Sequence, residues 1–189
     1  MIRSLSDEIA VKLATDMLIS GRIVIMPCDT IYGILGLSPE TEEKINGIKG
    51  RLPEKPYIRL LDDVKTLHRV SSKKIPEGLL ELLPAPLTLI LRDTSGQDIG
   101  YRVPDDKRLL EILSYIKKPL FSTSVNKSGS PPLWKISDIR ETFGEEVDLI
   151  LDGGDLPGGM PSTVLDITNK PYRVLRQGGF IVPARFLSL

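Results

Sequence analysis

Cysteine and histidine are almost absent from this chain of 189 residues, in which Cys28 and His68 are the only residues of their kinds. One cysteine cannot form a disulfide within the chain, and one histidine excludes a metal site built from several imidazoles. No apolar run is long enough to cross a membrane, and the N-terminal segment lacks the uninterrupted apolar core of a signal peptide. We therefore expect a cytoplasmic enzyme or binding protein with no membrane partner and no metal site of its own.

Net charge is also absent, because 25 basic residues balance 25 acidic ones. This balance argues against bulk attraction to nucleic acid or anionic membranes, but it does not exclude a local basic patch. Hydrophobic residues make up 41% of the chain and charged residues 26%, which is ordinary for a folded protein. The length suits one domain with a substantial core and barely two. We expect a single domain over residues 1–189.

Two catalytic motifs are missing. No G-x-x-x-x-G-K-[ST] occurs, so any nucleotide is held without a P-loop, and no G-x-S-x-G nucleophile elbow occurs. Cys28 stands at a strand end with no histidine near it in the sequence, and such a cysteine is more often inert packing than a nucleophile. Polar loops without a nucleophile indicate catalysis by positioning and charge neutralisation.

Hydrophobic periodicity predicts intermingled strands and helices with no linker or repeat. We expect helices over 6–20, 41–49, 107–116 and roughly 136–143, and short ones over 62–70 and 76–83. Strands are expected at 22–27, 57–61, 86–93, 119–126 and 147–154, with a terminal hairpin of 162–168 and 172–178. Regular crossover helices do not separate all the strands. The pattern therefore predicts one α/β domain with a mixed, twisted sheet flanked by helices, rather than a pure doubly wound sheet.

Polar or basic residues gather in three loops. The segment "PCDTIYGILG" (27–36) bends sharply and presents Asp29, Thr30 and Tyr32, with a capped turn as the alternative. "STSVNKSGSPP" (122–132) follows a strand, and Ser124 and Asn126 share one side of the extended chain; a simple turn-rich loop is the alternative. Strand ends of an α/β sheet bring such loops to a common edge, where ligands bind.

The third loop, "IKGRLPEKPYI" (48–58), holds Lys49, Arg51 and Lys55 between prolines and a glycine. Arg51 could grip a carboxylate or phosphate with a bidentate fork, and the lysines could add point charges. A solvated charge run is the alternative. Arg102 in "YRVP" and Arg176 in "VLRQG" lie in apolar extended contexts, where an edge arginine often only reaches outward to solvent. A further pair of hydroxyls stands at a strand entrance in "GGMPSTVLD" (158–166).

In order along the chain, "PCDTIYGI", "IKGRLPEKP", "APLTLIL", "YRVP", "STSVNKSG", "PSTVLDI" and "VLRQG" resemble the YrdC/TsaC family of L-threonylcarbamoyladenylate synthases. The resemblance runs from about Arg22 to Gly178. It implies a twisted α/β fold around a large concave, positively charged cavity. It also implies condensation of L-threonine, bicarbonate or carbon dioxide, and ATP into threonylcarbamoyl-AMP, with release of pyrophosphate. That nucleotidyl transfer would serve tRNA processing, because a downstream threonylcarbamoyl-transferase machinery places the group on tRNA adenosine.

The resemblance also implies roles for particular residues. The catalytic pair would be the K-x-R element, Lys49 and Arg51, which would face the nucleotide phosphates. ATP would be bound by Arg51, Lys55, Asn126 and Arg176. L-threonine would be bound by Thr30, Arg102, Ser124 and Ser162. Mg²⁺ would arrive with ATP and have no dedicated protein ligands.

Some positions depart from the family pattern. Cys28 replaces a threonine, Ala85 replaces a glycine, and "SPPLWKI" (130–136) places Trp134 where hydroxyl-rich residues are common. The chain ends near Leu189, which is the expectation for a short form without an additional C-terminal domain.

Three interpretations compete with the synthase. One is a YciO-like branch of the same fold, although intact K-x-R and S-x-N elements favour the synthase. The second is a non-catalytic module that grips tRNA or another structured RNA in the basic cavity. The third is a nucleotide-binding regulator that binds ATP without turnover.

Overall fold

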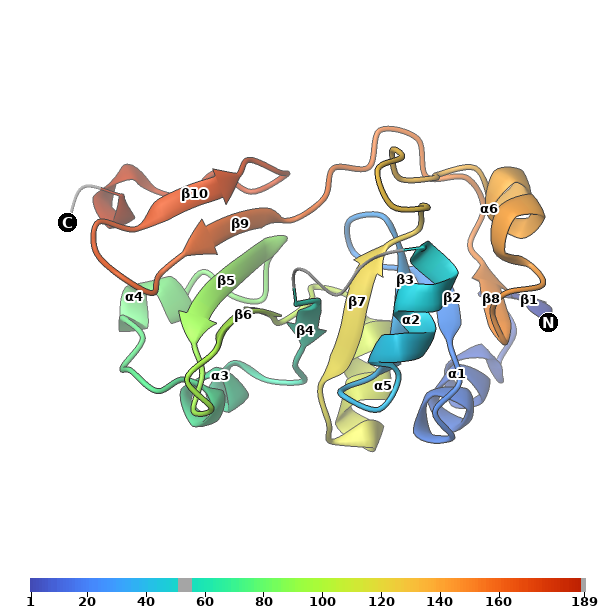
Figure 1. The fold of residues 1–189 in the computed structure, drawn as a ribbon, viewed down its shortest axis with the longest axis horizontal. Helices are drawn as coiled ribbons and strands as arrows, with labels where there is room; N and C mark the ends of the chain where they lie inside the picture. The colour runs from blue at the N-terminus through green and yellow to red at the C-terminus, as the bar shows by residue number, and fades with distance from the viewer. Residues whose placement is uncertain (51–55, 188–189) are drawn as a thin grey trace.

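A computed structural model describes residues 1–50 and 56–187. Within these ranges a single ten-stranded sheet runs in the order β1-β8-β2-β3-β7-β4-β6-β5-β9-β10, with helices packed against it (Figure 1). The strands are β1 Ile2–Ser4, β2 Val24–Pro27, β3 Tyr32–Leu37, β4 Ile58–Leu60, β5 Leu87–Arg92, β6 Asp98–Arg102, β7 Leu120–Ser124, β8 Leu149–Asp152, β9 Thr163–Asp166 and β10 Arg173–Arg176. The helices are α1 Ala10–Ile19, α2 Glu42–Lys49, α3 Val64–Val70, α4 Glu77–Leu80, α5 Lys107–Ile116 and α6 Ile136–Phe143, with a 3-10 turn, η1, at Ala184–Phe186.

The sheet is mixed, as the sequence predicts. It contains parallel pairs (β1 with β8, β2 with β8, β4 with β6, β5 with β9) and antiparallel ones such as β2–β3 and β3–β7. The expected terminal hairpin is present as β9 and β10. The helices over 107–116 and 136–143 have the predicted bounds. Asp106 caps the first of these by accepting a hydrogen bond from the Leu109 N–H.

Two expectations about local structure are wrong. The first helix begins at Ala10 rather than at Ser6, and its N-cap Ile9 makes no side-chain cap. Residues 5–9 form turns instead. Residues 2–4, for which no strand was predicted, form β1, which pairs with β8 almost 150 residues later in the chain. The second difference is β3, where "YGILGL" is a fully buried strand rather than the continuation of a polar loop. Its two glycines are residues that, by sequence alone, are typical of turns.

Side chains of the central strands alternate between two apolar layers, as the period of two along a strand requires. On one face, residues such as Val24, Leu35 and Leu149 pack against α1 and α5. On the other face, Ile25 and Ile34 belong to a cluster that includes residues of α2 and α6. A third cluster joins α3 and α4 to β5, β6 and β9, at the other end of the sheet (Figure 1). Within 1–50 and 56–187, no helix combines the length and apolarity that crossing a bilayer requires.

Glycine in β3 allows a close approach between the sheet and the loop that leads into α2. A Cβ atom on Gly36 would overlap the Oγ1 atom of Thr41, a buried hydroxyl that donates to the Leu37 carbonyl. Gly36→Ala is therefore expected to lower the free energy of unfolding by about 1–3 kcal/mol through overpacking. Urea denaturation measures this change.

The matched control is Gly47→Ala, because a Cβ atom there meets nothing within 4 Å and the residue lies inside α2. Alanine at that helical position should stabilise the protein by up to about 1 kcal/mol. Equal unfolding midpoints for the two variants would contradict the close packing of β3.

Candidate active site

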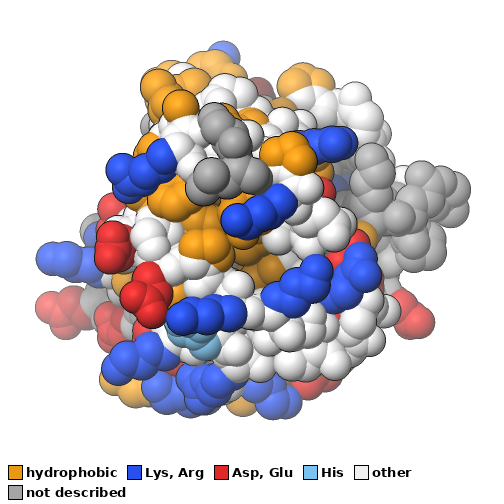
Figure 2. Space-filling model, turned by 90° about the vertical axis from the view of Figure 1, so that its left-hand side faces the viewer, with side chains coloured by type: hydrophobic (Ala, Val, Ile, Leu, Met, Phe, Trp, Pro, Cys, Tyr) orange, Lys and Arg blue, Asp and Glu red, His pale blue; other side chains and the backbone are white. Residues whose placement is uncertain are grey.

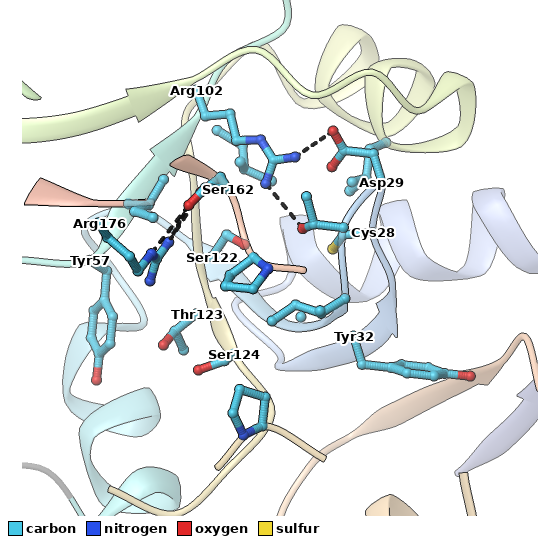
Figure 3. Close-up of a pocket in the computed structure, with 18 of the residues that line it drawn as sticks. Cys28, Asp29, Tyr32, Tyr57, Arg102, Ser122, Thr123, Ser124, Ser162 and Arg176 are labelled. Carbon is cyan, nitrogen blue, oxygen red and sulfur yellow. Dashed lines mark hydrogen bonds and ion pairs between the residues drawn. The ribbon is translucent and has the colours of Figure 1, made fainter. Parts of the chain in front are cut away.

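A cavity of about 240 Å³ opens where several strand ends and loops meet (Figure 3). The β2–β3 turn, the start of β4 and the ends of β6 and β7 form part of its wall. The segment before β9 and the end of β10 close the remaining side. Its lining includes Cys28, Asp29, Thr30, Tyr57, Arg102, Ser122, Thr123, Ser124, Pro161, Ser162 and Arg176. The cavity therefore joins segments that are more than a hundred residues apart in the sequence.

Arg102 is held at one side of this cavity by the β2–β3 turn. Its Nη2 atom forms a short ion pair with Asp29, and its Nη1 atom donates to the Thr30 hydroxyl at 3.3 Å. Both side chains of the ion pair are more than nine-tenths buried. Asp29 also accepts a hydrogen bond from the Asp105 N–H at 3.0 Å, which ties the turn to the segment after β6. This network fixes the guanidinium group, because each of its terminal nitrogens has a defined partner.

Arg176 faces the same cavity from β10. Its Nε and Nη2 atoms donate to the Ser162 carbonyl at 3.2 and 2.9 Å, and Nη2 also approaches the Ser162 hydroxyl at 3.2 Å. That hydroxyl in turn shares a hydrogen bond of 2.9 Å with the buried Thr88 hydroxyl. Partial burial, and next the positive charge of Arg102, lower the pKa of Arg176 below its ordinary value. Two like charges thus repel across the cavity, and an anion between them would relieve the repulsion.

The S-x-N element ends β7 and is tied to the K-x-R element. The Lys49 ammonium group belongs to a residue that is 4% exposed, and it donates to the Ser124 carbonyl at 2.7 Å. It also donates to the Asn126 carbonyl and to the Asn126 Oδ1 atom, both at 2.9 Å. The Ser124 hydroxyl donates to the same Oδ1 atom at 2.6 Å. Lys49 therefore holds the turn of the S-x-N element in place, whatever else it contacts.

Most of the residues assigned from the sequence come together in the structure. Five of them line the cavity: Thr30, Arg102, Ser124, Ser162 and Arg176. Lys49 and Asn126 adjoin it through their bonds to Ser124. Arg51 and Lys55 lie outside the described residues. The roles of all these residues in ligand binding and catalysis remain predictions.

The sequence did not identify Tyr57 and Thr88 as residues of the site. Tyr57 lines the cavity at the start of β4, and its hydroxyl donates to Asn46 in α2 at 2.6 Å. Thr88 supports Ser162 from inside β5. Both stand in ordinary strand contexts, and only the pairing of distant strands brings them to the cavity. The family resemblance, which assigned the other site residues, gave no role to either position.

Cys28 lines the cavity without the features of a nucleophile. Burial, partly offset by the positive charge of Arg102, raises the pKa of its thiol from 9.0 to about 12. Its Sγ atom lies near the Met26 carbonyl at 3.7 Å. A thiol with this pKa stays protonated at neutral pH, and the neutral form is a poor nucleophile. The structure thus agrees with the interpretation of Cys28 as inert packing.

Fold and cavity together define an α/β protein whose converging guanidinium and hydroxyl groups suit a small anionic ligand. The chain belongs to the Sua5/YciO/YrdC family, because the family model described as "Telomere recombination" matches residues 16–178. A threonylcarbamoyl-AMP synthase of Pyrococcus abyssi is 31% identical over 194 residues, which cover 94% of this chain and 56% of that protein. A putative threonylcarbamoyl-AMP synthase of Methanocaldococcus jannaschii is 30% identical, covering 90% of this chain and 86% of the relative.

Solved structures agree with this assignment. P. abyssi Sua5 complexed with L-threonine is 29% identical and superposes with a TM-score of 0.83, over 95% of this chain and 58% of that one. Escherichia coli YciO superposes with a TM-score of 0.80 over 95% of this chain and 94% of that one. Its identity of 23% supports the shared fold alone. The chain spans a little over half of the P. abyssi proteins it matches.

The raised pKa of Cys28 predicts slow alkylation of the folded protein. At pH 8 a shift from 9.0 to about 12 lowers the thiolate fraction about a thousandfold relative to an unfolded chain. Iodoacetamide should therefore label Cys28 far more slowly in buffer than in urea, as mass spectrometry would record. Cys28→Ser serves as the blank, since the chain has no second cysteine. Labelling at the same rate in both solvents would show that the thiol is reactive.

Proposed function

We propose that this protein condenses L-threonine, bicarbonate or carbon dioxide, and ATP into threonylcarbamoyl-AMP and pyrophosphate. The observation that carries the proposal is the convergence of Thr30, Arg102, Ser124, Ser162 and Arg176 on one cavity. These five residues come from five separate parts of the chain, and the family resemblance assigns each of them to a substrate of this reaction. The names of the P. abyssi and M. jannaschii relatives support the same activity.

The chemistry requires bond formation without an enzyme nucleophile. The threonine nitrogen forms a bond to the carbon of bicarbonate or carbon dioxide and loses a proton, and one water leaves when bicarbonate is the source. An oxygen of the resulting carbamate then attacks the α-phosphorus of ATP, and the bond from that phosphorus to pyrophosphate breaks. Every reactant except carbon dioxide carries negative charge, so the protein must chiefly offset mutual repulsion and orient the reacting groups.

The cavity supplies groups for both tasks. Arg102 is assigned to the threonine carboxylate, with the Thr30, Ser124 and Ser162 hydroxyls around the amino acid. Arg176 is assigned to ATP from the opposite wall. Asn126 would contact the nucleotide from the end of β7, where Lys49 fixes its side chain. Arg51 and Lys55 complete the proposed ATP site, with Arg51 and Lys49 as the catalytic pair.

Mg²⁺ is proposed to enter with the ATP phosphates. In the part of the chain that the structure describes, no three His, Cys, Asp or Glu side chains form a group that could hold a metal ion. Asp29, the one carboxylate among the cavity-lining residues described, is already paired with Arg102. We therefore assign no protein ligand to the ion.

We place the reaction in the cytoplasm and assign its product to the machinery that modifies tRNA.

Pyrophosphate release should depend on both threonine and bicarbonate, because the carbamate that attacks ATP forms only when both are present. Incubation with Mg·ATP and each co-substrate in turn, followed by a pyrophosphate assay and detection of the carbamoyl adenylate, measures this dependence. Omitting either co-substrate should reduce release to background. ATP turnover that ignores both omissions would identify an ordinary ATPase. Binding of ATP without turnover would favour a regulator or a YciO-like protein.

Asp29 acts in this proposal as a positioning residue for Arg102. Asp29→Asn keeps the side-chain shape but leaves a buried guanidinium without its carboxylate, which typically costs about 3–5 kcal/mol. We expect kcat/KM for threonine to fall at least tenfold, with the KM for ATP changing much less. Steady-state kinetics with each substrate varied, together with thermal unfolding, separates the two effects.

The matched control is Asp105→Asn, since Asp105 meets Asp29 only through its backbone N–H and its side chain is exposed. Its kinetics should stay near those of the wild type. If Asp29→Asn lowered the melting temperature while both KM values and kcat stayed unchanged, Asp29 would be a stabilising residue with no part in substrate binding.

A further inference from the structure

A second cavity, of about 270 Å³, lies at the other end of the β9–β10 hairpin. Its walls are the loop between α3 and α4, the end of β5 and the turn between β9 and β10; its lining residues are Ser71, Lys73, Lys74, Ile75, Pro76, Leu91, Arg92, Ile167, Thr168, Asn169, Lys170 and Tyr172. No residue within 1–50 or 56–187 lines both cavities. Ser162 and Ile167 are five extended residues apart, which separates the two cavities by roughly 16 Å along the strand.

The second cavity is strongly cationic. Among the described residues that line it, four are lysine or arginine and none is acidic, in a chain whose net charge is zero. Arg92 is neutralised by Asp98 through two bonds of 2.8 Å, and Lys74 has a loose partner in Glu77 at 3.8 Å. In the ranges that the structure describes, no carboxylate forms an ion pair with the remaining two, which are Lys73 and Lys170.

Local contacts hold one of these charges at the cavity wall. The Lys73 ammonium group donates to the Thr168 carbonyl at 3.1 Å, so the α3–α4 loop and the β9–β10 turn meet across the cavity. The Ser71 hydroxyl donates to the Lys73 carbonyl at 2.7 Å and fixes the backbone of the same loop. Lys170 approaches from the turn itself. A charge held in place loses less entropy on binding an anion than a free side chain does.

The remaining lining combines apolar contact with neutral hydrogen-bonding groups. Ile75 and Leu91 are buried, Tyr172 adds an aromatic ring, and the exposed Asn169 adds a side-chain amide. Figure 2 shows the end of the molecule that these elements form, with lysine and arginine side chains around a hydrophobic area. Cations bind phosphate, whereas aromatic and apolar surfaces accept the face of a base. This pairing of surfaces is suited to a nucleotide.

We propose that the second cavity binds the phosphate of a nucleotide, with Lys73 and Lys170 as the phosphate contacts and the Tyr172 side of the cavity beside the base. The nucleotide is either free or part of an RNA strand, since both present the same chemistry. This site is separate from the proposed synthase site and does not depend on it.

The test compares Lys73→Ala/Lys170→Ala with the control Lys12→Ala/Lys107→Ala, which removes the same charge from α1 and α5. Affinity for a labelled single-stranded RNA of about twelve nucleotides is measured between about 50 and 200 mM salt. The slope of log K against log salt is negative, and loss of two phosphate contacts should reduce its magnitude by about 1.4 in the first variant and leave it unchanged in the control. AMP is titrated into the same three proteins by calorimetry.

If the salt dependence of RNA binding becomes less steep only in Lys73→Ala/Lys170→Ala, the phosphate belongs to an RNA strand. Weaker AMP binding in that variant alone, with RNA affinity unaffected, establishes a free nucleotide. If both double variants match the wild type, or both lose affinity equally, the cavity is no phosphate site and the proposal is overturned. Pyrophosphate release by Lys73→Ala/Lys170→Ala should equal that of the wild type, so this test can fail without affecting the proposed synthase activity, and the reverse also holds.

Discussion

The buried ion pair between Arg102 and Asp29 is the contact on which the geometry of the cavity depends. It joins the end of β6 to the β2–β3 turn, two segments from different parts of the sheet. Two charges taken out of water are tolerated only when they are paired and hydrogen-bonded, and here Thr30 and the Asp105 N–H provide the additional bonds. Because Arg102 bonds to both Asp29 and Thr30, the ion pair also fixes the position of the Thr30 hydroxyl group in the cavity.

The charge distribution of the cavity follows from the same pair. Asp29 neutralises Arg102 at one wall, whereas Arg176 on the opposite wall has a carbonyl and a hydroxyl as its described partners. The described part of the cavity thus holds more positive than negative charge, and the guanidinium groups of Arg102 and Arg176 each donate at least two hydrogen bonds. An anionic ligand would add the missing charge and offset the repulsion between Arg102 and Arg176. The protein needs no general surplus of positive charge to achieve this, which is consistent with a net charge of zero.

Strand topology explains how the chain builds two cavities at the ends of one hairpin. β9 pairs with β5 in parallel and with β10 in antiparallel orientation, so both ends of the hairpin meet loops from earlier in the chain. The end near Ser162 meets the ends of β6 and β7 and presents hydroxyls and guanidinium groups. The end near Thr168 meets the α3–α4 loop and presents lysines over an apolar floor. One hairpin therefore borders two cavities of different chemistry.

The sequence by itself predicted the fold class and most of the strands and helices, because hydrophobic periodicity is a local property of the chain. The resemblance of its motifs to a family pointed to five residues that line the cavity. The sequence could not reveal β1, β3 or β6. β1 depends on pairing with a strand almost 150 residues away, β3 contains glycines that are typical of turns, and β6 is defined by its pairing with β4 and β5. The ties of Lys49 to the S-x-N turn, the pairing of Arg102 with Asp29, and the support of Ser162 by Thr88 were decided by tertiary structure alone. Each of these contacts joins segments that only the order of strands in the sheet makes neighbours, and no local pattern encodes that order.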